Sequence, residues 1–125
     1  MGSSVAFLGI DIGSTITRAA LIDEDLHMIA LSNAPTHIDG TFETTVRDIR
    51  AASSKALVQA GYHADAIEGI CVSVSGIVDD KSGRAFSPVL GWIDPMPVRT
   101  IARKHIAAPV FVANDAQAAA VGEAH

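Results

Sequence analysis

The sequence predicts an α/β domain built on a mixed β-sheet, and three observations carry that prediction. Roughly the first thirty residues hold strand-like runs with no helical pattern between them. From residue 41 onward, helical periodicity and strand-like runs alternate. Apolar residues make up 49% of the 125 residues, which is enough for a core. Successive strands pair antiparallel and strands joined through helices pair parallel, so we expect the order β-β-β-α-β-(hairpin)-α-β-α.

The first three elements form an expected antiparallel meander. Residues 5–10 are a short apolar run with β-branched ends, which is typical of a buried strand. Residues 16–22 alternate, placing Thr17, Ala19 and Leu21 on one face. A polar turn at residues 23–25 leads to a third expected strand over residues 26–31, and a loop follows it.

A helix is predicted next, because apolar side chains recur at helical spacing from Thr41 to Gly61. Thr41 stands where a helix opens, and Gly61 stands where a C-terminal stop is expected. Residues 67–75 are a continuous apolar run, which predicts a strand buried on both faces.

The last third of the chain predicts a hairpin, a helix, a strand and the start of another helix. Residues 79–83 form a turn between short strands at 77–78 and 84–86, and "GWIDPMP" is interpreted as a loop. Pro97 fits the first turn of a helix. Residues 110–113 predict a strand, after which Asn114 or Asp115 caps a final helix.

Composition excludes several classes of protein. The net charge of −5 argues against binding nucleic acid, although backbone N–H groups could still bind a small anion. No apolar stretch approaches the roughly 20 residues that cross a bilayer, so we expect no membrane. The one cysteine, Cys71, allows no disulfide framework and fits the reducing cytoplasm. Metal-ligand spacing is absent among the five histidines, which are His27, His37, His63, His105 and His125.

Two carboxylates occupy equivalent places in this plan. Asp11 ends the first strand, and Asp115 follows the last strand at the start of a helix. Ligands of α/β sheets bind outside the carboxyl ends of the strands, so both could face one cleft. Asp115 would stay ionised at a helix N-terminus and could accept a proton from a hydroxyl. It could equally be a helix cap alone.

Small residues follow the strands that are predicted at residues 5–10 and 67–75. Gly13, Ser14 and Thr15 could let backbone and hydroxyl groups reach a phosphate. They could instead be a tight hairpin that needs Gly13 at positive φ. The turn lacks a Walker lysine, and no helix follows it as in a dinucleotide-binding fold. Gly76 could approach a sugar or only bend the chain, and packing is the favoured role for Trp92.

Three segments together resemble the ROK family, which comprises repressors, open reading frames and sugar kinases. They are "LGIDIGSTITRAALIDED", "GICVSVSGIVDDKSGRAFSPVLGW" and "PVFVANDAQAAAVGE", in the order of the family. The resemblance implies a ribonuclease-H-like fold of the actin, hexokinase and Hsp70 superfamily. Residues 1–125 would be the N-terminal lobe of a two-lobed protein whose C-terminal lobe is absent from this chain. "NDAQAAAVGEAH" reads as a helix that has barely begun, which fits a longer protein.

The resemblance implies an ATP-dependent sugar kinase that uses Mg²⁺. The first phosphate-binding turn of the family corresponds by position to Asp11, Gly13, Ser14 and Thr15. Asp11 would then be the carboxylate on the side of Mg²⁺ and the phosphates.

The sugar site is implied in the same way. Gly76 matches a sugar-contacting glycine, and Asn114 matches a ligand of a sugar hydroxyl. Asp115 matches the catalytic base that activates this hydroxyl for attack on the γ-phosphate. The chain itself holds no metal site, because the family's zinc site of one His and three Cys belongs to sequence beyond residue 125.

Departures from the family pattern leave two alternatives open. Ile16 stands where the family has Lys, Ser14 where it has a second Gly, and Ser75 where it has Pro. The Asn that usually follows Pro88 is also missing. The Ile16 and Ser14 departures allow a relative that binds sugar without turnover. The sugar-sensing domain of a ROK repressor is a separate alternative. We expect the full-length protein to be a cytoplasmic homo-oligomer, and the isolated 125 residues to be inactive.

Overall fold

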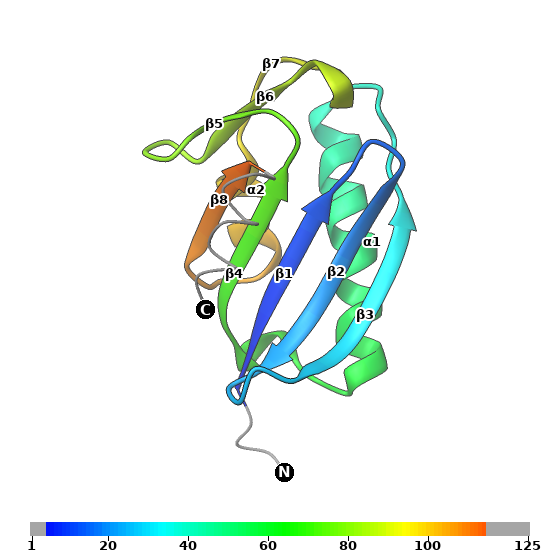
Figure 1. Cartoon of the computed structure of the whole chain (residues 1–125), viewed down its shortest axis with the longest axis vertical. Coiled ribbons are helices and arrows are strands. Elements are labelled where there is room, and N and C mark those ends of the chain that lie inside the picture. The colour runs from blue at the N-terminus through cyan, green and yellow to red at the C-terminus, as the bar shows by residue number, and fades with distance from the viewer. Residues whose placement is uncertain (1–4, 115–125) are drawn as a thin grey trace.

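A five-stranded mixed sheet forms the centre of the computed structural model, which describes residues 5–114 (Figure 1). Its strands lie in the order β3-β2-β1-β4-β8. The bounds of these strands are β1 Ala6–Ile12, β2 Ile16–Asp23, β3 Met28–Pro35, β4 Ile67–Val74 and β8 Val110–Asn114. The first three strands pair antiparallel, while β4 pairs parallel with β1 and with β8. The predicted antiparallel meander and mixed sheet are confirmed.

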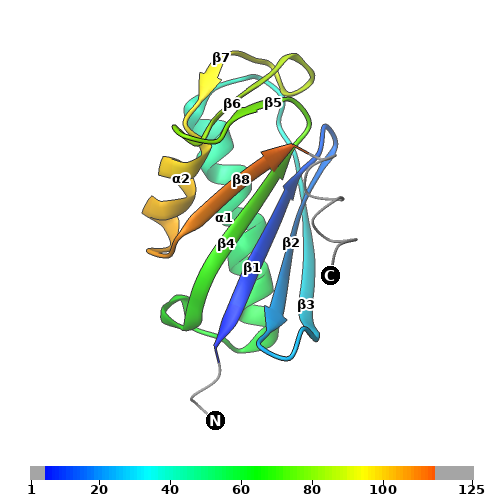
Figure 2. The ribbon, with the colours of Figure 1, turned by 60° about the vertical axis from the view of Figure 1, so that its left-hand side comes forward.

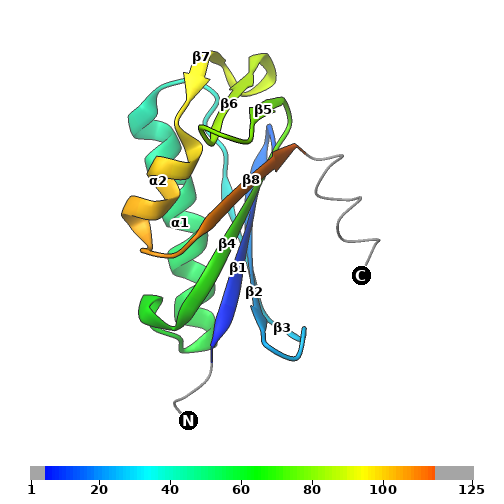
Figure 3. The ribbon, with the colours of Figure 1, turned by 90° about the vertical axis from the view of Figure 1, so that its left-hand side faces the viewer.

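Two helices, α1 Phe42–Ala60 and α2 Val98–His105, pack on one face of this sheet (Figure 3). As predicted, α1 is capped by Thr41, whose side chain accepts a hydrogen bond from the backbone of Thr44, and it ends at Gly61 in the left-handed conformation. Pro97 is the N-cap of α2, one residue before the helix. No helix of the described range is long and apolar enough to cross a membrane.

A small antiparallel sheet lies beyond the carboxyl ends of β1, β4 and β8 (Figure 2). It consists of β5 Ile77–Asp79, β6 Arg84–Ser87 and β7 Trp92–Met96, with a 3₁₀ turn at Pro88–Leu90. Another 3₁₀ turn, Ala64–Ala66, precedes β4.

The prediction that "GWIDPMP" is a loop is wrong, because these residues contain strand β7. Trp92 and Met96 pair with β6 and are only 3% and 5% exposed, so pairing with a distant segment overrides local sequence.

The third strand begins later than predicted. The turn after β2 extends through Leu26, a non-glycine residue at φ 68°, and the Asp23 carboxylate accepts hydrogen bonds from the backbone of Asp25 and His27. Strand β3 then continues to Pro35, because it pairs with β2 as far as Ile16. The predicted helix after Asn114 lies outside the described residues.

The two faces of the large sheet differ in burial. Side chains on the helix side form the core, whereas Phe7, Leu31 and Phe111 on the opposite face are 43%, 49% and 50% exposed. Burial of residues 67–75 on both faces was a wrong prediction for the described structure, since Cys71 is exposed and Ser73 half-buried. Within residues 5–114, much of this second face of the sheet is exposed, and we call it the open face.

Candidate functional site

A row of polar side chains crosses the open face near the carboxyl end of β1. Asp11 of β1 is in register with Arg18 of β2 on one side and with Ser73 of β4 on the other. Arg18 is in turn in register with Asn33 of β3. Directly opposed residues point to the same side of a sheet, so the row Asn33, Arg18, Asp11 and Ser73 lies on one face. The rest of the open face is mainly apolar.

A hydrogen bond fixes Asp11 within this row. The Ser73 hydroxyl donates to the Asp11 carboxylate at 2.9 Å, and both residues are half-buried. The two residues are 62 positions apart and meet because β1 and β4 are parallel neighbours. Sequence reasoning placed Asp11 at this edge but assigned no role to Ser73.

The turn after β1 brings Gly13, Ser14 and Thr15 next to Asp11. The N–H of Gly13 donates to the carbonyl of Ile16 at 3.1 Å, and a Cβ on Gly13 would lie 2.9 Å from that oxygen. Gly13 is needed for this close approach and is not at positive φ, which corrects the hairpin alternative. The N–H of Gly13 is thus occupied, whereas Ser14 and Thr15 are exposed and their hydroxyls are available to a ligand.

The loop that follows β3 is hydrogen-bonded to this turn. The backbone N–H of Thr36 donates to the carbonyl of Thr15 at 2.8 Å, and the Thr36 and Thr17 hydroxyls are 2.7 Å apart. The turn is therefore anchored to the segment that leads into α1.

Asn114, one of the predicted sugar ligands, lies at the same end of the sheet. Asn114 ends β8 in register with Val74 of β4, which pairs with Ile12 of β1. At about 4.8 Å per strand, Asn114 is about 10 Å across the sheet from the end of β1. Asp115, the predicted base, lies outside the described residues. The structure thus brings the Asn114 backbone and the Asp11 turn to one edge.

Gly76 has a structural explanation of its own. A Cβ at this position would lie 2.3 Å from the carbonyl oxygen of Phe86, so only glycine allows β6 to pass. The alternative that Gly76 serves the chain's path into the hairpin is supported, and its contact with sugar stays a prediction.

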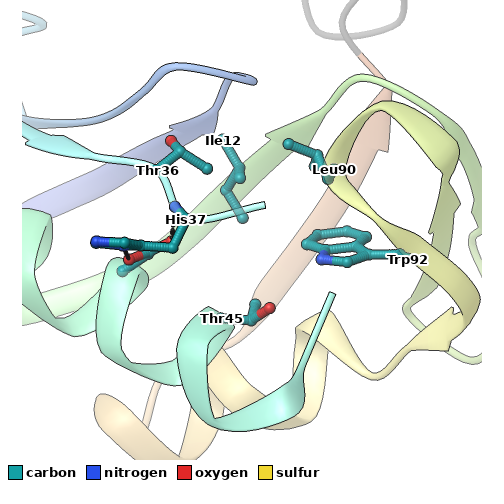
Figure 4. A pocket seen from close by; sticks show the side chains of 7 residues that line it. Ile12, Thr36, His37, Thr45, Leu90 and Trp92 are labelled. Carbon is teal, nitrogen blue, oxygen red and sulfur yellow. Dashed lines mark hydrogen bonds and ion pairs between the residues drawn. The ribbon is translucent and has the colours of Figure 1, made fainter. Parts of the chain in front are cut away.

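A small cavity below this edge is not a substrate pocket (Figure 4). Its volume of about 10 Å³ is close to the minimum for one water molecule. Trp92 lines it from the core side, which confirms the packing role. His37 and Asp48 lie at its other side, with His37 Nδ1 2.7 Å from Asp48 Oδ1 and the His37 N–H donating to Asp48 Oδ2 at 2.8 Å. Sequence reasoning missed this pair, although Asp48 on the apolar stripe of α1 was an available signal.

The fold and this edge define an α/β domain of the actin- and hexokinase-like class, with polar groups gathered at the carboxyl ends of parallel strands. The chain belongs to the ROK family, which it matches over residues 7–125. The predicted fold class and family are therefore confirmed.

Three relatives illustrate the range of the family. A glucokinase of Streptomyces coelicolor is 32% identical over 93% of this chain, and a xylose repressor of Caldicellulosiruptor bescii is 29% identical over 94%. The crystal structure of a Streptomyces griseus ROK glucokinase in complex with glucose and AMPPNP superposes with a TM-score of 0.79 at 32% identity, covering 94% of this chain. The chain spans about a third of each relative: 34% of the glucokinase, 30% of the repressor and 36% of the solved structure.

Proposed function

We propose that this chain is the N-terminal lobe of a two-lobed, ATP-dependent sugar kinase. The observation that carries the proposal is the shared edge: Asp11 and its turn end β1 beside β4, and β8 ends at the same edge with Asn114 immediately before Asp115. A carboxylate at this edge, with a second one next in the sequence after Asn114, suits phosphoryl transfer, which depends on positioning and charge stabilisation. The glucose and AMPPNP bound to the S. griseus relative support a sugar and ATP as ligands.

In the proposed reaction, Asp115 is the base and Asn114 holds the acceptor hydroxyl, with Gly76 beside the sugar. Asp115 takes the proton of the sugar hydroxyl while that oxygen bonds to the γ-phosphorus of ATP. The bond between the γ-phosphorus and the bridging oxygen breaks, so the products are a sugar phosphate and ADP. Base catalysis of this kind contributes about 10²- to 10⁴-fold to rate.

The groups at the end of β1 fit a bound metal nucleotide. Mg²⁺ is usually held by one or two carboxylates together with substrate phosphates, and Asp11 presents one carboxylate with an oxygen already fixed by Ser73. Bound Mg²⁺ would neutralise charge on the phosphates. The hydroxyls of Ser14 and Thr15 would donate to phosphate oxygens, and Gly13 keeps their turn tight.

The test of this mechanism is Asp115→Asn in the longer protein that contains this chain. We expect sugar phosphorylation to fall at least about 100-fold, since the amide cannot accept the proton. Asp80→Asn, in the exposed turn between β5 and β6, is the matched control and should keep parental activity. Equal rates for Asp115→Asn and the parent would end the proposal.

The isolated 125 residues should show no kinase activity. The proposal assigns the adenosine pocket, and any zinc site, to the second lobe beyond residue 125. Incubation of the purified chain with ATP and a panel of hexoses, followed by detection of sugar phosphate, checks this. Measurable turnover would contradict the two-lobed arrangement.

A sugar-sensing domain is the second candidate, because a xylose repressor is 29% identical over nearly the whole chain. Ile16 and Ser14, which depart from the family pattern, are compatible with a protein that binds sugar without turnover. Calorimetric titration of the longer protein with sugar and with ATP, each alone, separates the candidates. Binding of sugar but not ATP would favour the sensor.

We further propose that the longer protein works in the cytoplasm as a homo-oligomer. Cys71 is the one cysteine of these 125 residues, which fits a reducing compartment. Light scattering of the longer protein would test the oligomeric state, and a monomer would contradict it.

A further inference from the structure

Asp11 has polar neighbours on both sides within its row. Arg18 of β2 stands directly opposite it on one side and Ser73 of β4 on the other. Side chains opposed in this way have Cβ atoms about 4.5–5.5 Å apart, which is within reach of a long guanidinium. The Asp11 carboxylate can therefore turn to either strand.

The structure shows which neighbour holds it. Ser73 donates to Asp11 Oδ1 at 2.9 Å. Within residues 5–114, ion pairs join His27 to Asp23 and His37 to Asp48, and none joins Arg18 to Asp11. The carboxylate is thus held on the β4 side, away from the cation across from it.

The partner of the Asp11 carboxylate affects how well that carboxylate can bind a metal ion. A guanidinium binds a carboxylate through two parallel hydrogen bonds, which would occupy both oxygens and offset their charge. A serine hydroxyl occupies one oxygen and leaves the charge in place. Partners that orient a metal-binding side chain in this way affect metal affinity about 10- to 100-fold.

We infer that Ser73 is a positioning residue, whose hydroxyl keeps the Asp11 carboxylate available to the metal of a metal nucleotide and out of an ion pair with Arg18. The inference rests on the proposed function, because it assigns Asp11 to the metal side of the phosphates. It adds two residues, Ser73 and Arg18, with opposite effects on that carboxylate.

Ser73→Ala in the longer protein tests the inference. The Mg²⁺ concentration at half-maximal sugar phosphorylation should rise about 10- to 100-fold. The affinity for Mn²⁺ in the presence of ADP, measured by electron paramagnetic resonance without turnover, should fall by a similar factor. The KM for sugar should stay within about twofold, because the Ser73 hydroxyl is bonded to Asp11 on the proposed phosphate side and the substitution changes none of the proposed sugar ligands.

Two controls separate positioning from a general structural effect. Ser73→Thr keeps the hydroxyl and should restore parental Mg²⁺ dependence. Cys71→Ala changes the exposed residue two positions earlier on the same face of β4, and it should leave Mg²⁺ dependence unchanged. A loss with Thr as large as with Ala, or a loss with Cys71→Ala, would overturn the inference.

The double variant Ser73→Ala with Arg18→Ala tests the competing ion pair. Removing the guanidinium should recover at least half of the lost Mn²⁺ affinity on a logarithmic scale. No recovery would overturn the role given to Arg18.

The outcomes also distinguish this inference from the proposed function. If the parent binds Mn²⁺ with ADP in a Ser73-dependent way but phosphorylates no sugar, the kinase proposal fails and the inference stands. If the parent phosphorylates sugar and Ser73→Ala has the same Mg²⁺ dependence as the parent, the inference fails and the kinase proposal stands. A parent that binds no Mn²⁺ with ADP would overturn both.

Discussion

His105, the last residue of α2, makes stability dependent on pH. Its side chain is half-buried, and its Nε2 is buried with no hydrogen-bond partner among residues 5–114. Burial, and secondarily the charge of Arg50, lowers the pKa of His105 below its ordinary 6.5. The folded state therefore disfavours the protonated imidazole, while the unfolded chain accepts a proton near pH 6.5.

We expect the chain to lose stability as the pH falls below about 6.5 and through the lowered folded pKa of His105. His105→Leu should remove this part of the pH dependence. Urea unfolding between pH 8 and pH 5 measures it, and His63→Leu, at an exposed position, is the control. Parallel loss of stability in the parent and in His105→Leu would contradict the assignment.

Asp48 is a buried carboxylate whose two oxygens both have the same residue, His37, as their partner. It is 5% exposed, and its two oxygens meet the ring and the backbone N–H of His37. Asp48→Asn keeps the size but removes the negative charge and one of the two acceptor oxygens, so the His37 ring and the His37 backbone N–H no longer each meet a carboxylate oxygen. We expect the free energy of unfolding to fall by about 1–3 kcal/mol.

Urea unfolding at neutral pH checks this value, with the exposed Asp65→Asn as the matched control. The control should change stability by less than about 0.5 kcal/mol. If Asp48→Asn leaves the free energy of unfolding unchanged, the contact between His37 and Asp48 holds the loop without stabilising the fold.

At the scale of the element, α1 depends on its N-cap. The Thr41 hydroxyl accepts from the Thr44 N–H at 3.2 Å, and Asp39 accepts hydrogen bonds from the Thr41 N–H and the Thr44 hydroxyl. These bonds also hold the pKa of Asp39 below its usual value. The helix start is therefore a small network of side chains.

Thr41→Ala should lower the free energy of unfolding by about 1 kcal/mol, because a backbone N–H of the first turn loses its acceptor. Thr41→Ser retains the hydroxyl and should recover most of that loss. Circular dichroism followed through a urea titration measures both. Equal destabilisation by Ala and Ser would show that packing of the methyl group matters more than the cap.

Elements specified by local sequence were predictable, and those specified by distant partners were not. Helix α1 has its cap, stripe and stop within about twenty residues, so its bounds follow from sequence. Strand β7 contains Pro95 and exists because β6 pairs with it, which no local pattern shows. The site divides in the same way. Asp11 was predicted from its place at a strand end, whereas Ser73 and Arg18 follow only from strand register.

At the scale of the whole molecule, the open face should cause self-association of the isolated 125 residues. Phe7 and Phe111 are large, apolar and about half exposed on it. Patches of this kind mark surfaces that are covered by other parts of a protein. We expect sedimentation velocity to show mass rising with concentration.

Phe111→Thr, which keeps β propensity, should shift the association to higher concentration, since it removes apolar surface from the face. Val58→Thr, on the exposed side of α1, is the control and should not change it. A monomer at all concentrations would contradict the prediction.

The parallel pairing of β1 with β4 has a consequence for synthesis on the ribosome. The strands β1, β2 and β3 emerge first and can pair through short connections, but β4 arrives only after all of α1. Contacts of such long sequence separation form slowly. Until then one edge of β1 has unpaired N–H and carbonyl groups, which is the kind of edge that recruits other chains. The strand that holds Asp11 therefore keeps one edge unpaired until β4 has been made, and a chaperone that covers this edge would protect the growing chain from association.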